Sequence, residues 1–450
     1  VVTAGDNVVV NADDETRTAM VVGSLAVGAT GGGVGLSVGL SLITKDTEAE
    51  IADSADITAL AGGSGVNAYS GTGFSDTAVA NGVVVSANSN ESIFTLGIAG
   101  GGGLFVGIAG SVSVQLLDIT TLASVGDATI DDSALNSGAN GAQDVVVVAR
   151  DSSSVAAIDG GLAIGAGAVA GAVDVGILRN STEATIADGA TINAKDRVEV
   201  AGLQNTGVQS TVVSAAGGLI GIAAGVSVYS IGDGIDPGSK ASNEINSAGD
   251  LGTYAQGDLN DTSVDQLLAS SDNTTVKGIG TRMATSRSNV QVAGKIDNGS
   301  PSNVPTGTLA SVGNGDIAAG GAVSVAALDT LGTDTKAGAV AVGALGLGAG
   351  VGIVLVDTTD TAQVEGTSTL AAGSLSVNAT STHTLNATSI AGTGGLIAAE
   401  AAVTVLEDSS ATMARIDGAD IATSGAVSVR ANDHRTGASE VNPGAVGSAC

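Results

Sequence analysis

Glycine, serine and alanine alternate with branched apolar residues in several segments of the chain. The clearest examples are GGGVGLSVGLSLI at residues 31–43, GGGLFVGIAGSVSV at 101–114 and GGLIGIAAGVSVYSI at 217–231. A period of two places successive side chains on opposite faces of a β-strand. We therefore predict strands in these segments, with the branched residues facing the core. The opposite face, made of small residues, is then either covered, by a partner rod or by part of the same chain, or it only eases stacking at a tight coil.

The same pattern argues against a membrane helix. The segment GAGAVAGAVDVGIL at residues 165–178 contains a single charge, at Asp174. A membrane-spanning helix needs about 20 consecutive apolar residues. Each glycine also disfavours a helix by roughly 1 kcal/mol relative to alanine. The segment is too short and too rich in glycine, so we expect no membrane span in this chain.

A short motif of the form V-x-V-x-A/G recurs along the chain. It begins at Val8, Val83, Val145, Val198, Val290, Val323, Leu375 and Val427. The last three starts are 52 residues apart, and those at 145 and 198 are 53 apart. The wider intervals, from 8 to 83 and from 83 to 145, indicate one repeat each with an insertion. A fixed period in this range is typical of repeat architectures.

Such repeats favour an all-β fold, a parallel β-helix or solenoid built from repeats of about 52 residues with inserted loops. Equivalent residues of successive coils then stack in ladders about 4.8 Å apart. A repeat of this length is expected to hold two or three coils, which gives a rod roughly 80–120 Å long. The Asp188-Gly189 and Asp417-Gly418 turns are expected to supply corners with positive φ.

Two regions depart from the repeat and divide the chain. We predict solenoid repeats in residues 1–231 and 322–450, with a loop insertion at about 61–82 that contains Tyr69 and Phe74. Residues 232–321 are predicted to form a divergent, loop-rich insertion. This region carries three of the four prolines and a candidate helix at 261–270. Loops on a regular scaffold often carry specific binding.

Composition narrows the function classes. With 69 glycines, 1% aromatic residues and no tryptophan among 450 residues, the chain suits a thin core of small side chains. A net charge of −30 excludes a nucleic-acid partner and disfavours anionic lipid surfaces. Cys450 is the single cysteine, so no disulfide forms within the chain, and we expect no zinc site made from it with His383 and His434. Without an initiator methionine or a signal peptide, the sequence is expected to be a piece of a longer secreted protein.

Several short motifs suggest chemistry but fit the repeat better. Gly35-Leu36-Ser37-Val38-Gly39 matches a nucleophile elbow, yet the same place in other repeats reads as a strand. The glycine runs GGGVG and 100–103 lack the lysine and hydroxyl of a phosphate loop. The acidic groups Asp131-Asp132 and Asp13-Asp14-Glu15 are interpreted as solvated turns. Calcium is the one cofactor weighed, with Asp233, Asp236 and Asp250 as its candidate ligands, and no catalytic residue is predicted.

The unit A-x-A-G-A-x-x-x-G-x-x-x-N-x-T-x-A-x-I-x-x-G-A-x-I-x-A…V-x-V-x-A, clearest in residues 165–202, resembles a known repeat. It is similar to the repeats of large bacterial filamentous adhesins, the leukotoxin-type and filamentous-haemagglutinin-like autotransporters. The resemblance implies a right-handed parallel β-helix on the bacterial cell surface, used for attachment or assembly. The insertion at 232–321 is not part of that pattern, and no receptor site carries over.

These observations together predict a structural or adhesive extracellular rod or fibre segment without catalysis. Its expected partners are copies of itself, end to end or side by side, and a host or neighbouring-cell surface. Two alternatives remain open at this stage. One is a β-helix protein that acts on or binds polysaccharide, and the other is a non-catalytic passenger of a toxin-like autotransporter.

Overall fold

The chain forms mostly long β-strands in a computed structural model that describes residues 1–132, 136–233, 306–366 and 369–447. Within these ranges the only helical segment is the short 3₁₀ helix η1 (Asn136–Gly138), and none forms an α-helix. No helix in the same ranges is long and apolar enough to cross a membrane. The candidate helix at 261–270 and the motif at Val290 lie outside the described residues.

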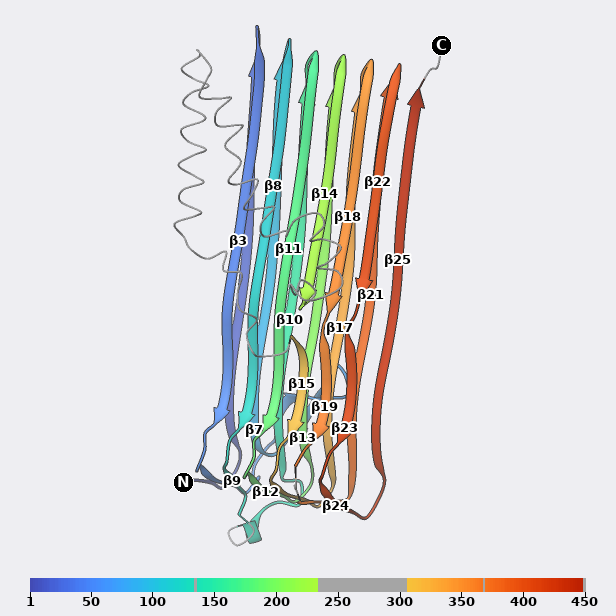
Figure 1. Cartoon of the computed structure of the whole chain (residues 1–450). Coiled ribbons are helices and arrows are strands. Elements are labelled where there is room, and N and C mark those ends of the chain that lie inside the picture. Colours follow the sequence, from blue (N-terminus) through green and yellow to red (C-terminus); the bar gives the residue numbers. More distant parts are fainter. Residues whose placement is uncertain (133–135, 234–305, 367–368, 448–450) are drawn as a thin grey trace. The chain divides into compact units, whose positions relative to one another are not determined.

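Three parallel sheets make up the fold, and we call them sheets A, B and C (Figure 1). Sheet A contains seven short strands: β1 (Val2–Ala4), β4 (Asp56–Ala59), β9 (Thr129–Ile130), β12 (Thr191–Ala194), β16 (Asp316–Ala319), β20 (Thr369–Ala372) and β24 (Asp420–Thr423). Sheet B contains seven long strands: β2 (Val8–Gly28), β7 (Gly82–Gly103), β10 (Asp144–Ile164), β13 (Val198–Gly217), β17 (Ala322–Val342), β21 (Ser374–Gly395) and β25 (Val427–Gly447).

Sheet C contains both long and shorter strands: β3 (Gly32–Ile51), β8 (Val106–Val125), β11 (Gly167–Ile186), β14 (Ile220–Gly232), β15 (Gly307–Val312), β18 (Leu345–Asp357), β19 (Thr359–Val364), β22 (Ile397–Asp408) and β23 (Ala411–Ile416). Strands β15 and β16 begin after residue 306, inside the region assigned to the insertion at 232–321, and both join the main sheets.

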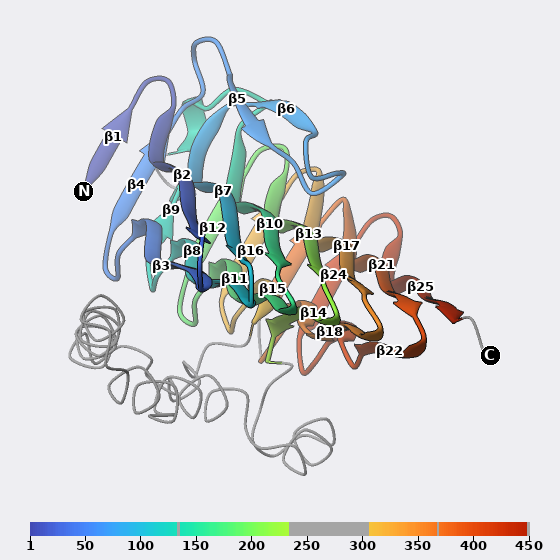
Figure 2. The same cartoon turned by 90° about the horizontal axis from the view of Figure 1, so that it is seen from above.

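Each repeat contributes one strand level to each sheet, and we call this level a rung. In sheet B, Ala322 of β17 lies beside Ser374 of β21, and Leu375 lies beside Val427 of β25. Residues one repeat apart are therefore direct neighbours, so the expectation of two or three coils per repeat is wrong. The strands succeed one another in chain order (Figure 2). Seven strands spaced about 4.8 Å apart give a stack roughly 30 Å deep, well short of the expected rod.

The V-x-V motifs belong to an apolar core at the end of the long strands where all three sheets meet, and we call it the lower core. Their second valines stack in register from rung to rung, and all but the last pack into this core, since Val429 on the terminal strand β25 is 43% exposed. This ladder consists of Val10, Val85, Val147, Val200, Val325, Val377 and Val429. The prediction that like residues lie over like is confirmed for this motif.

In the segments of the long strands that lie away from the lower core, the side chains have the opposite orientation to the predicted one. In β3, Gly33, Gly35 and Ser37 are buried, whereas Leu36 and Val38 are exposed. The branched residues therefore face outward and the small residues face inward, which is the opposite of the prediction.

The reason for this orientation is the close approach of sheets B and C. A Cβ atom added to Gly35 would lie 2.1 Å from the carbonyl oxygen of Gly100. One added to Gly101 would lie 1.9 Å from the carbonyl oxygen of Ile108. Only residues with the smallest side chains fit where two backbones touch.

The prediction of corners with positive φ at the Asp-Gly turns is confirmed. The turn glycines Gly189 and Gly418 have φ of 86° and 74°, as expected at Asp-Gly corners. The insertion at 61–82 leaves the repeat as an antiparallel hairpin of β5 (Val66–Tyr69) and β6 (Thr77–Ala80). The guanidinium of Arg150 holds this hairpin, since it lies 4.5 Å from the ring centroid of Tyr69 and 4.0 Å from that of Phe74.

Candidate functional site

Charged side chains gather inside the protein, between sheets B and C. In β7, Val85 belongs to the lower core, Glu91 follows in a polar layer, and Ile93 belongs to the next apolar cluster. The same order of layers recurs in the neighbouring strands. Members of this polar layer are Asp14, Lys45, Glu91, Asp151, Asn180, Asp329, Asp360, His383 and Asp408. Because an unpaired buried charge is costly, the partners of these groups decide what the layer can do.

At the N-terminal end of the layer, Lys45 joins sheet C to sheet B. Its ammonium donates to a carboxylate oxygen of Glu91 at 2.5 Å and lies 2.9 Å from an oxygen of Asp14. Burial alone would lower the pKa of Lys45, but hydrogen bonds and charges from Glu91 and Asp14 outweigh it and raise that pKa. At this end of the layer the buried charge of Lys45 is therefore paired with two carboxylates.

In the middle of the layer, Asp151 pairs with no cationic side chain among the residues that the structure describes. Its carboxylate accepts hydrogen bonds from the amide of Asn180 at 2.7 Å and the hydroxyl of Ser153. Burial, together with the charge of Glu91, raises the pKa of Asp151 well above its usual range. Its surroundings therefore favour the neutral form of Asp151 over the charged one.

At the C-terminal end, His383 bridges two carboxylates. Its Nε2 lies 2.9 Å from Oδ2 of Asp329 and its Nδ1 lies 2.8 Å from Oδ2 of Asp408. Burial alone would lower the pKa of His383, but the hydrogen bonds and charges of Asp329 and Asp408 raise it to about 10. The ring is an imidazolium that donates from both nitrogens. Arg435 in β25 pairs with Asp408 at 3.3 Å.

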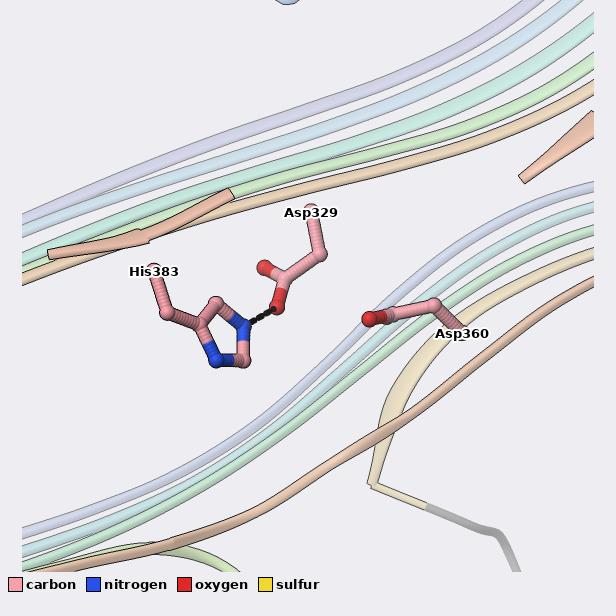
Figure 3. A group of neighbouring side chains, drawn as sticks. All are labelled: Asp329, Asp360 and His383. Atoms are coloured by element: carbon pink, nitrogen blue, oxygen red, sulfur yellow. Dashed lines mark hydrogen bonds and ion pairs between the residues drawn. The ribbon is translucent and has the colours of Figure 1, made fainter. Parts of the chain in front are cut away.

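Asp360 approaches the same cluster from the opposite sheet (Figure 3). One of its oxygens accepts from the backbone N–H of Thr308 at 3.2 Å and from the Thr308 hydroxyl at 2.6 Å. Burial raises the pKa of Asp360 to about 8, and the nearby charge of Asp329 adds to that rise. One ligand atom each from Asp329, Asp360 and His383 lies within 4.8 Å of the others, and all three residues are buried. This is the arrangement in the described part of the chain that most resembles a metal-binding site.

A second buried polar cluster lies farther along the long strands. Asp174 accepts hydrogen bonds from the hydroxyls of Ser210 and Tyr229, at 2.5 and 2.8 Å, and from the amide of Gln115 at 3.0 Å. Burial raises the pKa of Asp174, and it raises that of nearby Asp159 to about 7. Both oxygens of Asp174 accept hydrogen bonds here, whereas Oδ2 of Asp159 has no partner in the described structure, so this cluster is a partly satisfied hydrogen-bond network inside a thin layer.

The residues singled out from the sequence do not converge on a site. Asp233 is exposed after β14, and the other two calcium candidates, Asp236 and Asp250, lie outside the described residues. Ser37 lies inside a continuous strand, so Gly35–Gly39 forms no nucleophile elbow.

The paired acids turn out to be structural. Asp131 is buried and accepts from the backbone N–H of Ala59 at 2.8 Å. Asp13 accepts from the amide of Asn88, while Asp14 pairs with Lys45. The interpretation of these acids as solvated turns is wrong for Asp131 and Asp14. Sequence reasoning missed Lys45, Glu91, Asp329 and Asp360, whose signal was a charge at an inward-facing position of an alternating strand.

Beyond the polar layer, the long strands form a region that we call the blade. The blade comprises residues 21–43, 94–117, 156–178, 209–232, 337–356 and 387–406. No charged side chain within these ranges is exposed: Asp159 and Asp174 are buried, and Glu400 is half-buried. Large apolar side chains nevertheless remain open to solvent on both outer faces, with Leu25 80% exposed and Val38 66% exposed. Patches of this kind mark interaction surfaces.

The outer face of sheet B in the blade is a checkerboard of large and small residues. Across one row, branched residues alternate with glycines from strand to strand. That row reads Gly23, Ile98, Gly160, Val213, Gly338 and Ile390. The next row has the opposite phase, with large residues at Leu25, Leu162 and Val340 and small ones at Gly100, Ala215 and Gly392. Each protruding side chain therefore has small residues on either side of it.

The outer face of sheet C is different, because it carries ladders of like residues. One ladder consists entirely of valines: Val38, Val112, Val173, Val226, Val351 and Val403. On this face the valines form one continuous ridge that runs from strand to strand across the sheet. Both outer faces of the blade are therefore apolar, but large and small residues alternate on sheet B, whereas like residues form ladders on sheet C.

No protein-family model, curated protein or solved structure matches this chain.

Proposed function

We propose that the three sheets are the successive faces of a parallel β-helix. In this proposal the chain is a structural segment of an extracellular rod or fibre that associates with copies of itself. Parallel pairing in register, with one rung per repeat, supports the fold assignment. The resemblance of residues 165–202 to filamentous adhesin repeats supports the location and the right-handed coil.

The observation that carries this proposal is the charge-free, apolar outer surface of the blade. Six strands about 4.8 Å apart, with about ten residues at 3.3 Å each, give a face of roughly 950 Å². A stable protein interface needs about 800 Å² on each partner. One face of the blade is therefore large enough to hold a second copy.

The checkerboard of sheet B favours a second copy as its occupant. Large side chains such as Leu162 and Val340 would enter the glycine positions of a facing copy whose pattern is shifted by one strand. Interdigitation of this kind makes dry, closely packed sheet interfaces. The chain has a net charge of −30, and among the described residues only Asp159, Asp174 and Glu400 carry charge within the blade, so repulsion between copies acts mainly on other surfaces.

Open strand edges supply a second direction of growth. Strand β2 pairs only with β7, and strand β25 pairs only with β21, within the part of the chain that the structure describes. Unpaired edges are templates for another strand. Further rungs of the same kind, from the same chain or from another copy, would satisfy them.

Light scattering after gel filtration, together with negative-stain electron microscopy, tests this proposal on the full chain. The wild-type protein should assemble in a concentration-dependent manner into threads or layers. The double variant Leu162→Glu/Val340→Glu should lose lateral assembly, because it places charges in the sheet B face. Ser154→Glu is the matched control, since Ser154 is an exposed residue of the same strand as Leu162 but lies outside the blade.

A wild-type protein that stays monomeric and globular at high concentration would contradict the proposal. Lipid-vesicle flotation without self-assembly would contradict it as well, because the blade would then insert into lipid. Assembly that survives the double variant unchanged would exclude sheet B as the lateral interface.

A further inference from the structure

The cluster of Asp329, Asp360 and His383 contains buried oxygens that nothing satisfies. Oδ1 of Asp329 and Oδ2 of Asp360 have no hydrogen-bond partner in the described structure. Both side chains are inaccessible, with Asp360 0% exposed and Asp329 2% exposed. Most buried polar atoms in proteins have a partner, and an unseen water or ion is one explanation for an exception. Other buried atoms of this protein also lack a partner, but here two such oxygens lie beside an imidazole nitrogen. The Asp360 carboxyl also points into the space beside Asp329 and His383 (Figure 3).

The surroundings of His383 match those of a metal ligand. A histidine that binds a metal through one nitrogen usually donates its other N–H to a carboxylate, which fixes the ring and its tautomer. In this protein Nδ1 lies 2.8 Å from Asp408, and Arg435 pairs with Asp408 from the next rung. Nε2 is left facing Asp329 and the hydroxyl of Ser381, each at 2.9 Å.

We propose that Asp329, Asp360 and His383 bind one divalent first-row transition-metal ion, of the zinc or manganese class, in the interior of the protein. The ion would accept Nε2 of His383 and one oxygen from each aspartate, with the Ser381 hydroxyl as a neighbouring fourth group. Imidazole nitrogen with carboxylate oxygen is a ligand set for such metals. Calcium and magnesium prefer all-oxygen sites and should bind poorly.

An ion bound here would displace any protons held by its ligand atoms, and those protons would be released to solvent. Metal ligands must be deprotonated, so binding should weaken as the pH falls. The groups that face the ion are the two aspartates, His383 and Ser381, with Asp408 and Arg435 behind the histidine.

The site would connect three separate strands. Asp329 lies in β17 and Asp360 in β19 of the same rung, whereas His383 lies in β21 of the next rung. One ion would therefore tie sheet B to sheet C and one repeat to its neighbour. This role does not depend on self-assembly, so either proposal can fail without the other.

Metal content of the full chain tests this inference. The protein is stripped with a chelator, mixed with Zn²⁺ or Mn²⁺ alone at pH 8, passed through gel filtration and analysed by mass spectrometry for metal. We expect one equivalent bound, and at least a tenfold loss of affinity in Asp360→Asn and in His383→Gln. Asp159→Asn is the control, because Asp159 is an equally buried acid outside the cluster.

A second readout needs no variant. His383 and His434 are the two histidines of the chain, and His434 is exposed. Binding should shift the ¹⁵N resonance of one ring nitrogen of His383 and leave His434 unchanged. A folded wild-type protein that binds no stoichiometric metal would overturn the proposal. Metal bound with the affinity of the wild type after both substitutions, or without a shift of His383, would also overturn it.

Discussion

Lys45 of the first rung and Glu91 of the second form an ion pair in the protein interior. Their charged atoms are 2.5 Å apart, and their side chains are 8% and 0% exposed. Strands β3 and β7 belong to different sheets, so this pair connects neighbouring repeats across the core. The partner of each charge is thus supplied by an adjacent repeat, and this makes the order of the rungs specific.

Removing one member of this pair should destabilise the protein more than removing both. Lys45→Met leaves Glu91 buried without a cation, which costs about 3–5 kcal/mol in the free energy of unfolding. The double variant Lys45→Met/Glu91→Gln should recover most of that loss, because neither charge remains buried alone. Urea unfolding of the two single variants and the double variant measures the coupling. Simple addition of the two single effects would show that the residues act independently.

The close contact of sheets B and C should be intolerant of a single methyl group. Gly35→Ala places a Cβ 2.1 Å from the carbonyl oxygen of Gly100, so the two sheets must separate. We expect a loss of about 3 kcal/mol in the free energy of unfolding. Gly171→Ala is the control, because a Cβ at Gly171 meets nothing within 4 Å. The control should be neutral or slightly stabilising, and equal effects of the two substitutions would refute this account of the blade.

Stability should decrease as the pH rises from 5 to 9. Burial raises the pKa of Asp131 to about 6, of Asp159 to about 7 and of Asp360 to about 8. The unfolded chain loses these protons at lower pH than the folded chain, so folding becomes less favourable until each folded pKa is passed. His383 acts in the same direction. Its stabilising charge is complete below its ordinary pKa of 6.5 and is lost as the pH rises through about 10.

Urea midpoints at pH 5, 7 and 9 measure this trend. Asp159→Asn removes one of the groups and should flatten the decline between pH 4 and 7, by up to about 4 kcal/mol. Substitution of an exposed acid such as Glu15 should leave the pH dependence in place. A midpoint that increases from pH 5 to 9 would show that the buried acids are ionised in the folded protein.

The hairpin of β5 and β6 should detach when Arg150 is shortened. The guanidinium stacks on Tyr69 and Phe74, and it also donates to the carbonyl oxygen of Phe74 at 3.2 Å. Arg150→Ala removes both contacts, worth about 1–2 kcal/mol. Limited proteolysis should then cut within residues 70–76, and Arg150→Lys should give an intermediate rate. An unchanged rate in Arg150→Ala would mean that other contacts hold the hairpin, such as that of Glu199 with the backbone of Gly71.

The sequence alone determined the strands and the repeat, because both are local properties. Alternation in segments such as 31–43 predicts a strand whatever surrounds it, and a spacing of 52 residues brings like residues together. The insertion at 61–82, predicted as a loop, and the turn at Gly189 are visible in the sequence for the same reason, because each interrupts a regular pattern. The pairing of the insertion as a hairpin comes from the structure alone.

Only the tertiary structure decided which face of each strand is inside. The alternation has a period of two whether Leu36 or Gly35 points inward. The apolar side chain of Leu36 makes it the expected choice for the inward position. The distance between sheets B and C reverses that choice, because it leaves no room for a Cβ atom at Gly35. The cluster of Asp329, Asp360 and His383 was equally hidden, because its members come from two sheets and two rungs, and only pairing between repeats brings their side chains together.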